Sequence, residues 1–123
     1  MEIKKILIID DDHLISMFMN RKLNKLGYEC KACLDPREAI QIIQEFKPNL
    51  IFLDVMMPVI NGIELAHIIK NTESISNIPI IIISAKSNKQ DINSAYNIGV
   101  HKYIFKPITL SEVINEIEEL KKV

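Results

Sequence analysis

The sequence contains no tryptophan, only three glycines and only two cysteines, and aromatic residues make up 6% of its 123 residues. Two cysteines are too few for the disulfide framework that holds a small secreted domain together. The apolar run near the N-terminus is too short for a signal peptide or a membrane-spanning helix, and acidic residues follow it at once. There are no repeats, low-complexity tracts or linkers. We therefore expect a cytoplasmic protein that neither enters nor crosses a membrane.

The chain also lacks an excess of charge of either sign. It has 15 basic and 16 acidic residues, which gives a formal net charge of −1. Such a balance does not produce the long-range field of a nucleic-acid or membrane-surface binder, so we expect protein partners or small ions and no direct contact with nucleic acid. With 48% hydrophobic residues, the length suits a single domain over residues 1–123.

Cys30 and Cys33 form a C-x-x-C motif, which in other contexts marks a redox pair or half of a zinc site. Here the motif lies in a strand-like stretch, where an odd separation places the two side chains on opposite faces. No second cysteine or histidine pair completes a zinc site. Two free thiols are the prediction.

The hydrophobic pattern alternates between strands and helices along the whole chain. Continuous apolar runs such as "KILII" are typical of strands covered on both faces, whereas "YECKA" is more polar and suits a sheet edge. Apolar residues at three-to-four spacing indicate amphipathic helices. The expected strands cover 5–9, 28–32, 49–54, 79–84 and 102–105, and the expected helices cover 12–26, 39–46, 62–71, 90–98 and 109–120.

Two of these helices differ in how firmly we expect them to be held. The first carries an apolar stripe that we predict to face inward, comprising Ile15, Phe18, Met19, Leu23 and Leu26. The helix over 90–98 has a thin apolar face, so we expect it to be the least firmly held.

Five strand–helix units in alternation predict an α/β fold, in which a parallel sheet has helices on both faces. In such sheets, ligands bind at the carboxyl ends of the strands, near the point where the strand order reverses. The residues that follow each strand are therefore the candidates for a functional site.

Polar residues follow four of the apolar strands. Asp10 and Asp11 follow the first, Asp54 ends the third, Ser84 ends the fourth, and Lys106 follows the fifth. Three converging carboxylates would repel one another unless a cation lay among them. A site with few oxygen ligands and open positions suits Mg²⁺ better than Ca²⁺. Because neighbouring strand residues point in opposite directions, we expect one of Asp10 and Asp11 to bind directly and the other through water or at longer range.

Lys106 and Ser84 add an ammonium and a hydroxyl beside this acidic site. A metal ion, an ammonium and a hydroxyl around a carboxylate are the components of a phosphoryl-transfer site. Asp54 is then the predicted nucleophile, which forms an acyl phosphate.

Four segments, "ILIIDDD", "FLDVMMPVING", "IIIISAK" and "YIFKP", in this order and spacing, resemble the CheY-like response-regulator receiver domain of two-component signalling. The resemblance covers essentially the whole chain. It implies a flavodoxin-like (βα)5 fold with a five-stranded parallel sheet in the order 2-1-3-4-5. It also implies that the chain is a phospho-accepting signalling domain rather than an enzyme.

The resemblance further assigns roles to individual residues. Asp54 is implied to accept phosphate from a phosphohistidine on a sensor histidine kinase or phosphotransfer protein. Asp11, Asp54 and the backbone carbonyl of Met56 are implied to hold Mg²⁺ or Mn²⁺, assisted by Asp10. Lys106 is implied to reach the site through a cis bond to Pro107.

Signal output is also implied by the resemblance. Ser84 and Tyr103 are the implied switch pair, and the face formed by the fourth helix, the fifth strand and the last helix is implied to bind a downstream protein or effector domain. The domain is expected to be monomeric or to form a phosphorylation-linked dimer. Met56 and Lys86 flank the site, and we hypothesise that they position attacking water poorly and make the phosphate long-lived.

Three other classes of protein share parts of this pattern. A phosphatase of the haloacid-dehalogenase type needs a second aspartate two residues after its nucleophile, and that position is Met56 here. A flavodoxin-like FMN binder needs a hydroxyl- or glycine-rich loop where this chain has three acids. A phosphate-independent receiver that acts only by protein contact is the alternative that we keep. Tyr103 read alone is a half-buried strand aromatic, and the three histidines show no ligand spacing.

Overall fold

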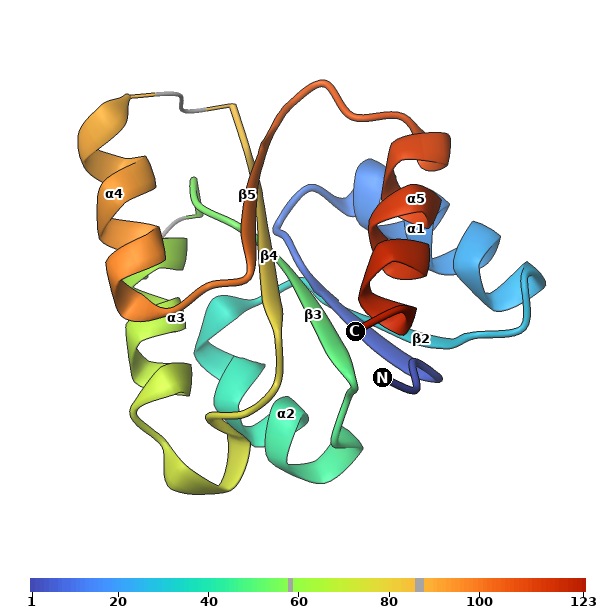
Figure 1. Ribbon diagram of the computed structural model, residues 1–123, viewed down its shortest axis with the longest axis horizontal. Coiled ribbons are helices and arrows are strands. Elements are labelled where there is room, and N and C mark those ends of the chain that lie inside the picture. The colour runs from blue at the N-terminus through green and yellow to red at the C-terminus, as the bar shows by residue number, and fades with distance from the viewer. Residues whose placement is uncertain (58, 86–87) are drawn as a thin grey trace.

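The structure is a computed structural model that describes residues 1–57, 59–85 and 88–123 (Figure 1). Within these residues, five strands alternate with five α-helices. The strands form one parallel sheet in the order β2-β1-β3-β4-β5. The α/β fold and the strand order are as predicted. The strands are β1 (Lys5–Ile9), β2 (Glu29–Cys33), β3 (Leu50–Asp54), β4 (Ile80–Ser84) and β5 (Lys102–Phe105). The helices are α1 (His13–Lys25), α2 (Ala39–Phe46), α3 (Gly62–Lys70), α4 (Lys89–Ile98) and α5 (Leu110–Lys121).

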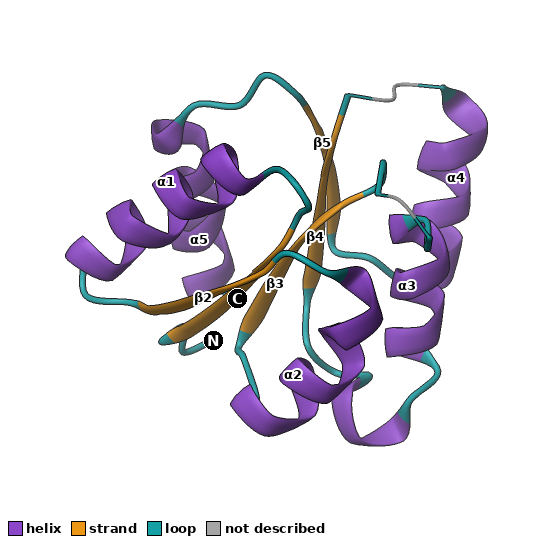
Figure 2. Cartoon of the chain, turned by 180° about the vertical axis from the view of Figure 1, so that it is seen from behind, coloured by secondary structure: helices purple, strands orange, loops and turns teal. Residues whose placement is uncertain are grey.

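The helices cover the two faces of the sheet in unequal numbers. Helices α1 and α5 lie on one face, and α2, α3 and α4 lie on the other (Figures 1 and 2). Successive residues of a strand point to opposite faces, so each central strand supplies both hydrophobic cores. In β1, Leu7 and Ile9 join the core under α2, α3 and α4, whereas Ile6 and Ile8 join the core under α1 and α5.

Side-chain caps define where several helices begin. The Asp12 carboxylate accepts hydrogen bonds from the backbone N–H groups of Leu14 and Ile15 at the start of α1. At α5, Thr109 and Glu112 form a capping box. The Asp35 carboxylate accepts a bond from the Arg37 N–H and caps a short 3-10 helix over Pro36–Glu38, which precedes α2.

The inward stripe that the sequence predicts for α1 is partly wrong. Met19 and Leu23 are buried as expected, but Ile15, Phe18 and Leu26 are 43%, 54% and 54% exposed. Helical spacing identifies an apolar face, but it does not show how much of that face a neighbouring element covers. The thin packing predicted for α4 is confirmed, because Ala95 alone is buried among its residues.

Strand β2 lies at one edge of the sheet, as predicted, and carries both cysteines. Cys30 packs in one core and Cys33 in the other, and both thiols are free. Burial raises the pKa of Cys30 to about 12 and that of Cys33 to about 11, so neither thiol ionises readily. No helix in the described part of the chain has the length and apolar character that a membrane span requires.

Candidate functional site

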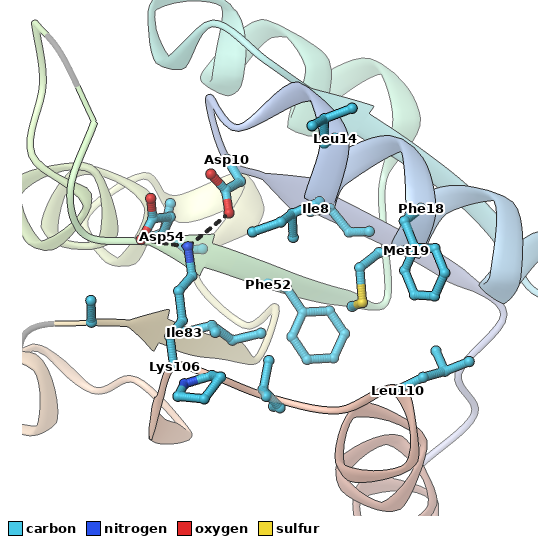
Figure 3. A pocket seen from close by; sticks show the side chains of 15 residues that line it. Ile8, Asp10, Leu14, Phe18, Met19, Phe52, Asp54, Ile83, Lys106 and Leu110 are labelled. Carbon is cyan, nitrogen blue, oxygen red and sulfur yellow. Dashed lines mark hydrogen bonds and ion pairs between the residues drawn. The ribbon is translucent and has the colours of Figure 1, made fainter.

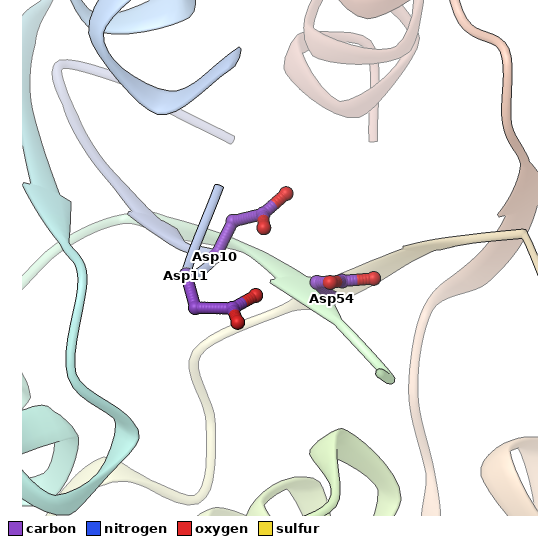
Figure 4. A group of neighbouring side chains, drawn as sticks. All are labelled: Asp10, Asp11 and Asp54. Atoms are coloured by element: carbon purple, nitrogen blue, oxygen red, sulfur yellow. The ribbon is translucent and has the colours of Figure 1, made fainter. Parts of the chain in front are cut away.

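An acidic cluster lies at the carboxyl edge of the sheet (Figure 4). Asp10, Asp11 and Asp54 each contribute a carboxylate oxygen, and these oxygens lie within 4.8 Å of one another. The parallel register explains this meeting, because Ile9 of β1 lies opposite Leu53 of β3 and the chains continue directly into the aspartates. The backbone leaves the strand after Ile9, so strand alternation does not separate Asp10 from Asp11 as the sequence suggested.

Asp10 is held in place by the first turn of α1. Its carboxylate accepts a hydrogen bond of 2.9 Å from the backbone N–H of Asp12. Its backbone carbonyl accepts a bond of 3.0 Å from the hydroxyl of Ser16, which is fully buried. Ser16 is not one of the strand-end residues predicted from the sequence. Its position is unusual in the sequence, because a small polar residue there lies among the apolar residues of a helix, and this could have indicated a buried hydroxyl.

Lys106 brings a cation to the acidic cluster, as predicted. Its ammonium lies 3.2 Å from an oxygen of Asp10 and 3.5 Å from an oxygen of Asp54 (Figure 3). Its backbone N–H donates a bond of 2.8 Å to the carbonyl of Ser84, and its bond to Pro107 is cis, as expected. Burial alone would lower the pKa of Lys106, but the two carboxylates outweigh it and the pKa is raised. The side chain therefore remains a cation.

Asp54 is the most perturbed carboxylate of the site. It is 6% exposed, and its pKa is raised to about 6. Desolvation is the largest cause, repulsion from Asp10 is the second, and attraction to Lys106 opposes both. Because burial and a neighbouring carboxylate disfavour the Asp54 anion, the approach of a further cation would stabilise it.

The loop after Asp54 is folded tightly against the site. The Met56 backbone donates a hydrogen bond to the Asp54 carboxylate, and the Val55 carbonyl accepts bonds from Met57 and Gly62. Gly62 has no room for a side chain, because a Cβ atom there would overlap the Asp54 carbonyl and approach Val55 Cα to 2.7 Å. The arrangement places the Met56 backbone beside the cluster, so its carbonyl stays a predicted ligand.

Ser84 ends β4, and Tyr103 lies near the start of the neighbouring strand β5. Ser84 is fully buried, Tyr103 is 7% exposed, and their side chains are joined by a hydrogen bond. Burial raises the pKa of the Tyr103 phenol, so it stays protonated. The Tyr103 backbone N–H donates a bond of 3.1 Å to the hydroxyl of Tyr96 on α4. The spacing of apolar residues along helices and strands does not predict this last contact.

The remaining predictions concern residues around the cluster. Met56 is 54% exposed beside it. Lys86, the other flanking residue of the phosphate-lifetime hypothesis, lies outside the described residues. His13, His67 and His101 are exposed and none belongs to the acidic cluster. The site thus consists of three carboxylates, an ammonium and a buried hydroxyl, which is a set suited to phosphoryl transfer.

Comparisons with known proteins point to one family. A family model described as "Response regulator receiver domain" matches residues 6–118. The phosphate regulon transcriptional regulatory protein PhoB of Pseudomonas aeruginosa is 36% identical over 115 residues, which are 94% of this chain and 50% of PhoB. Protein PilG of the same organism is 30% identical over 114 residues, which are 93% of this chain and 84% of PilG.

Solved structures agree with the sequence comparisons. A two-component response regulator from Clostridium difficile superposes with a TM-score of 0.90 at 28% identity, covering 97% of this chain and 96% of that one. The chain spans about half the length of several curated relatives, among them PhoB.

Proposed function

This chain belongs to the response regulator receiver domain family of two-component signalling, and on that premise we propose that Asp54 accepts a phosphoryl group in a Mg²⁺-dependent reaction. The observation that carries the proposal is the position of the Lys106 ammonium, which lies within 3.5 Å of both Asp10 and Asp54. An ammonium held there can bind the oxygens of a phosphoryl group on Asp54 as charge develops.

The donor set of the acidic cluster fits a small divalent cation. Three carboxylate oxygens within 4.8 Å of one another are hard ligands, which Mg²⁺ prefers. We propose that Asp10, Asp11, Asp54 and the carbonyl of Met56 hold Mg²⁺, with Mn²⁺ as the alternative ion. The bound ion would neutralise the anionic oxygens of the incoming phosphoryl group.

The proposed donor is a phosphohistidine on a sensor histidine kinase or phosphotransfer protein. A carboxylate oxygen of Asp54 attacks the phosphorus, a P–O bond forms and the P–N bond breaks, so that the imidazole, protonated on its other nitrogen, leaves as the neutral ring. Asp54 needs no general base for this step, because neutral pH lies above its pKa of about 6 and the side chain is already a carboxylate. The near-neutral charge of the chain supports a protein partner rather than nucleic acid for this domain.

The proposed output passes through Ser84 and Tyr103. A phosphoryl group on Asp54 offers the Ser84 hydroxyl a new acceptor, and the population of conformers shifts by the energy difference that this contact provides. The Tyr103 ring already lies inward in this structure, and we propose that phosphorylation favours that arrangement. The weakly packed α4, together with β5 and α5, then presents the surface that a downstream protein or effector domain binds.

Two further expectations belong to the same proposal. We propose that residues 1–123 form one receiver domain, which is supported by the single continuous sheet and by the match over residues 6–118. We also propose a cytoplasmic domain that is monomeric or dimerises on phosphorylation. Its chemistry is limited to its own phosphorylation and dephosphorylation.

Intact-mass spectrometry after incubation with acetyl phosphate and Mg²⁺ tests the function. We expect a gain of about 80 Da, the mass of one HPO₃ group, that is lost in Asp54→Asn and without the metal. If small donors give no gain, a set of phosphorylated histidine kinases is tested next. No gain from either would contradict the proposal and favour a phosphate-independent interaction module.

A further inference from the structure

A cavity of about 590 Å³ opens between α1, the sheet and the segment that joins β5 to α5 (Figure 3). Its volume lies in the range of sites that bind small organic molecules. The buried side chains of Phe52 and Ile83 come from the sheet, Met19 and Phe18 come from α1, and Leu110 begins α5. This wall is almost entirely apolar.

The α1 side of the cavity explains why the inward stripe was only partly observed. Leu14, Ile15 and Phe18 line the cavity, and they are 84%, 43% and 54% exposed. Adjacent bulky apolar residues left in water on one side of a helix mark a surface that gains energy when an apolar group covers it.

The polar end of the same cavity is the site described above. Asp10, Asp54 and Lys106 line it together with the apolar residues, and Figure 3 shows them at one end, with Phe52 and Met19 beyond. The cavity therefore has two chemically different parts. One part is charged and carries an ammonium and two carboxylates, and the other part is apolar.

We propose that this cavity is a subsite for the hydrocarbon group of a small phosphoryl donor, namely an acyl phosphate with an apolar chain longer than acetyl. The proposal deepens the proposed function and rests on phosphorylation of Asp54. The phosphoryl group lies at Asp54 and Lys106, while the acyl chain lies against Phe18, Met19 and Leu110. The anionic phosphoryl group of such a donor matches the charged part of the cavity, and its hydrocarbon chain matches the apolar part.

The reaction balances without a further reactant. A carboxylate oxygen of Asp54 attacks phosphorus, a new P–O bond forms, and the P–O bond to the acyl group breaks. The leaving group departs as a carboxylate with the bonding electron pair, so no proton transfer is required. Aliphatic acyl groups of different length are leaving groups of nearly equal acidity, so differences in rate report contacts with the chain.

The experiment is a homologous series of acetyl, butyryl and hexanoyl phosphate at equal concentrations below saturation, with Mg²⁺ and the complete chain. Full burial of one methylene changes affinity about four-fold, and a half-open cavity gives less. We expect the second-order rate constant for phosphorylation of Asp54 to rise at least ten-fold from acetyl to hexanoyl phosphate. Equal rates, or rates that fall with chain length, would overturn the proposal.

A matched pair of variants locates the effect. Phe18 and Met17 are neighbours on α1 with similar exposure, 54% and 51%, but only Phe18 lines the cavity. The hexanoyl-to-acetyl rate ratio, measured within each variant, should fall several-fold in Phe18→Ala and stay as in the unmodified chain in Met17→Ala. A ratio that is unchanged in both variants would contradict the assigned location.

A second readout does not depend on phosphorylation. Hexylphosphonate, which cannot transfer its phosphorus group, should shift the NMR methyl signals of Leu14, Met19 and Leu110, whereas methylphosphonate should not. If neither acetyl phosphate nor a phosphorylated histidine kinase modifies Asp54, the proposed function fails, yet these shifts still report whether the subsite exists. A groove that serves only the helix of a partner protein would show neither shifts nor chain-length dependence, and that result overturns the proposal.

Discussion

The ammonium of Lys106 lies 3.2 Å from a carboxylate oxygen of Asp10, and the two residues are 96 positions apart in the chain. Both side chains are largely buried, so water screens their attraction only weakly. Lys106 also approaches Asp54 to 3.5 Å. One cation thus offsets part of the repulsion between two buried carboxylates, and several testable predictions depend on this balance.

Replacing Asp54 with asparagine should stabilise the metal-free protein at neutral pH. Desolvation and repulsion from Asp10 raise the pKa of Asp54 from 3.8 to about 6, so its anion is disfavoured in the fold. Between pH 3.8 and about pH 6 the folded protein therefore binds a proton that the unfolded chain releases. The free energy of unfolding falls as the pH rises through this range, and the stabilising contribution is lost above about pH 6. We expect Asp54→Asn to gain on the order of 2 kcal/mol at pH 7.5 and little at pH 4.

Urea unfolding with a chelator present measures this difference at the two pH values. Asp12→Asn is the control, because Asp12 is exposed and asparagine also caps a helix. A metal-free Asp54→Asn protein that is less stable than the unmodified chain at pH 7.5 would show that the fold does not disfavour the ionised carboxylate.

Asp11→Asn should weaken Mg²⁺ binding at least ten-fold, because it removes a charged oxygen from the acidic cluster. Isothermal titration with Mg²⁺ measures the affinity. Asp12→Asn makes the same change of charge one residue away, outside the cluster, and should alter the affinity less than three-fold. Equal weakening by both variants would indicate a diffuse electrostatic effect rather than a ligand.

Lys106→Met should slow phosphorylation by acetyl phosphate about a hundred-fold, because it removes the positive charge nearest to the phosphoryl group. Without metal it should also destabilise the fold at pH 7.5, because Asp10 and Asp54 then repel each other without a cation. Lys102→Met is the matched control. Lys102 pairs with Glu116 2.8 Å away but is about half exposed, and such pairs contribute little. Similar rates for both variants would remove Lys106 from the proposed mechanism.

Gly62→Ala should destabilise the protein by more than about 3 kcal/mol, since its Cβ would overlap the backbone of Asp54 and Val55. Gly99→Ala is the comparison. A Cβ atom at Gly99 meets nothing within 4 Å, so its cost, about 1 kcal/mol, comes from the positive φ of 108° alone. Thermal unfolding ranks the two variants, and an equal loss in both would mean that the loop around Asp54 moves to accommodate the methyl group.

The sequence predicted which carboxylates and which ammonium lie together at the edge of the sheet, because its signals are local. Asp54, Ser84 and Lys106 each come at the end of an apolar strand, and parallel topology brings such ends to one edge. The residues that were missed act through contacts between elements. Ser16 supports Asp10 from inside α1, and Tyr96 reaches Tyr103 from α4, and neither contact follows from the spacing of apolar residues.

The α1 helix shows the same limit for the hydrophobic pattern. Ile15 and Phe18 carry the spacing of a buried stripe, yet they remain exposed beside a cavity. Spacing depends only on the geometry of one helix, whereas burial depends on the shape of the surface opposite.

The sequence itself determined three features: the alternation of strands and helices, the helix caps at Asp12 and Thr109, and the polar residues at the strand ends. Each depends on the conformation of a few consecutive residues. Tertiary structure alone decided the 3.2 Å approach of Lys106 to Asp10, the raised pKa of Asp54 and the apolar cavity beside them. Electrostatic and solvation energies depend on distances and on excluded water, and only packing between distant segments sets those quantities.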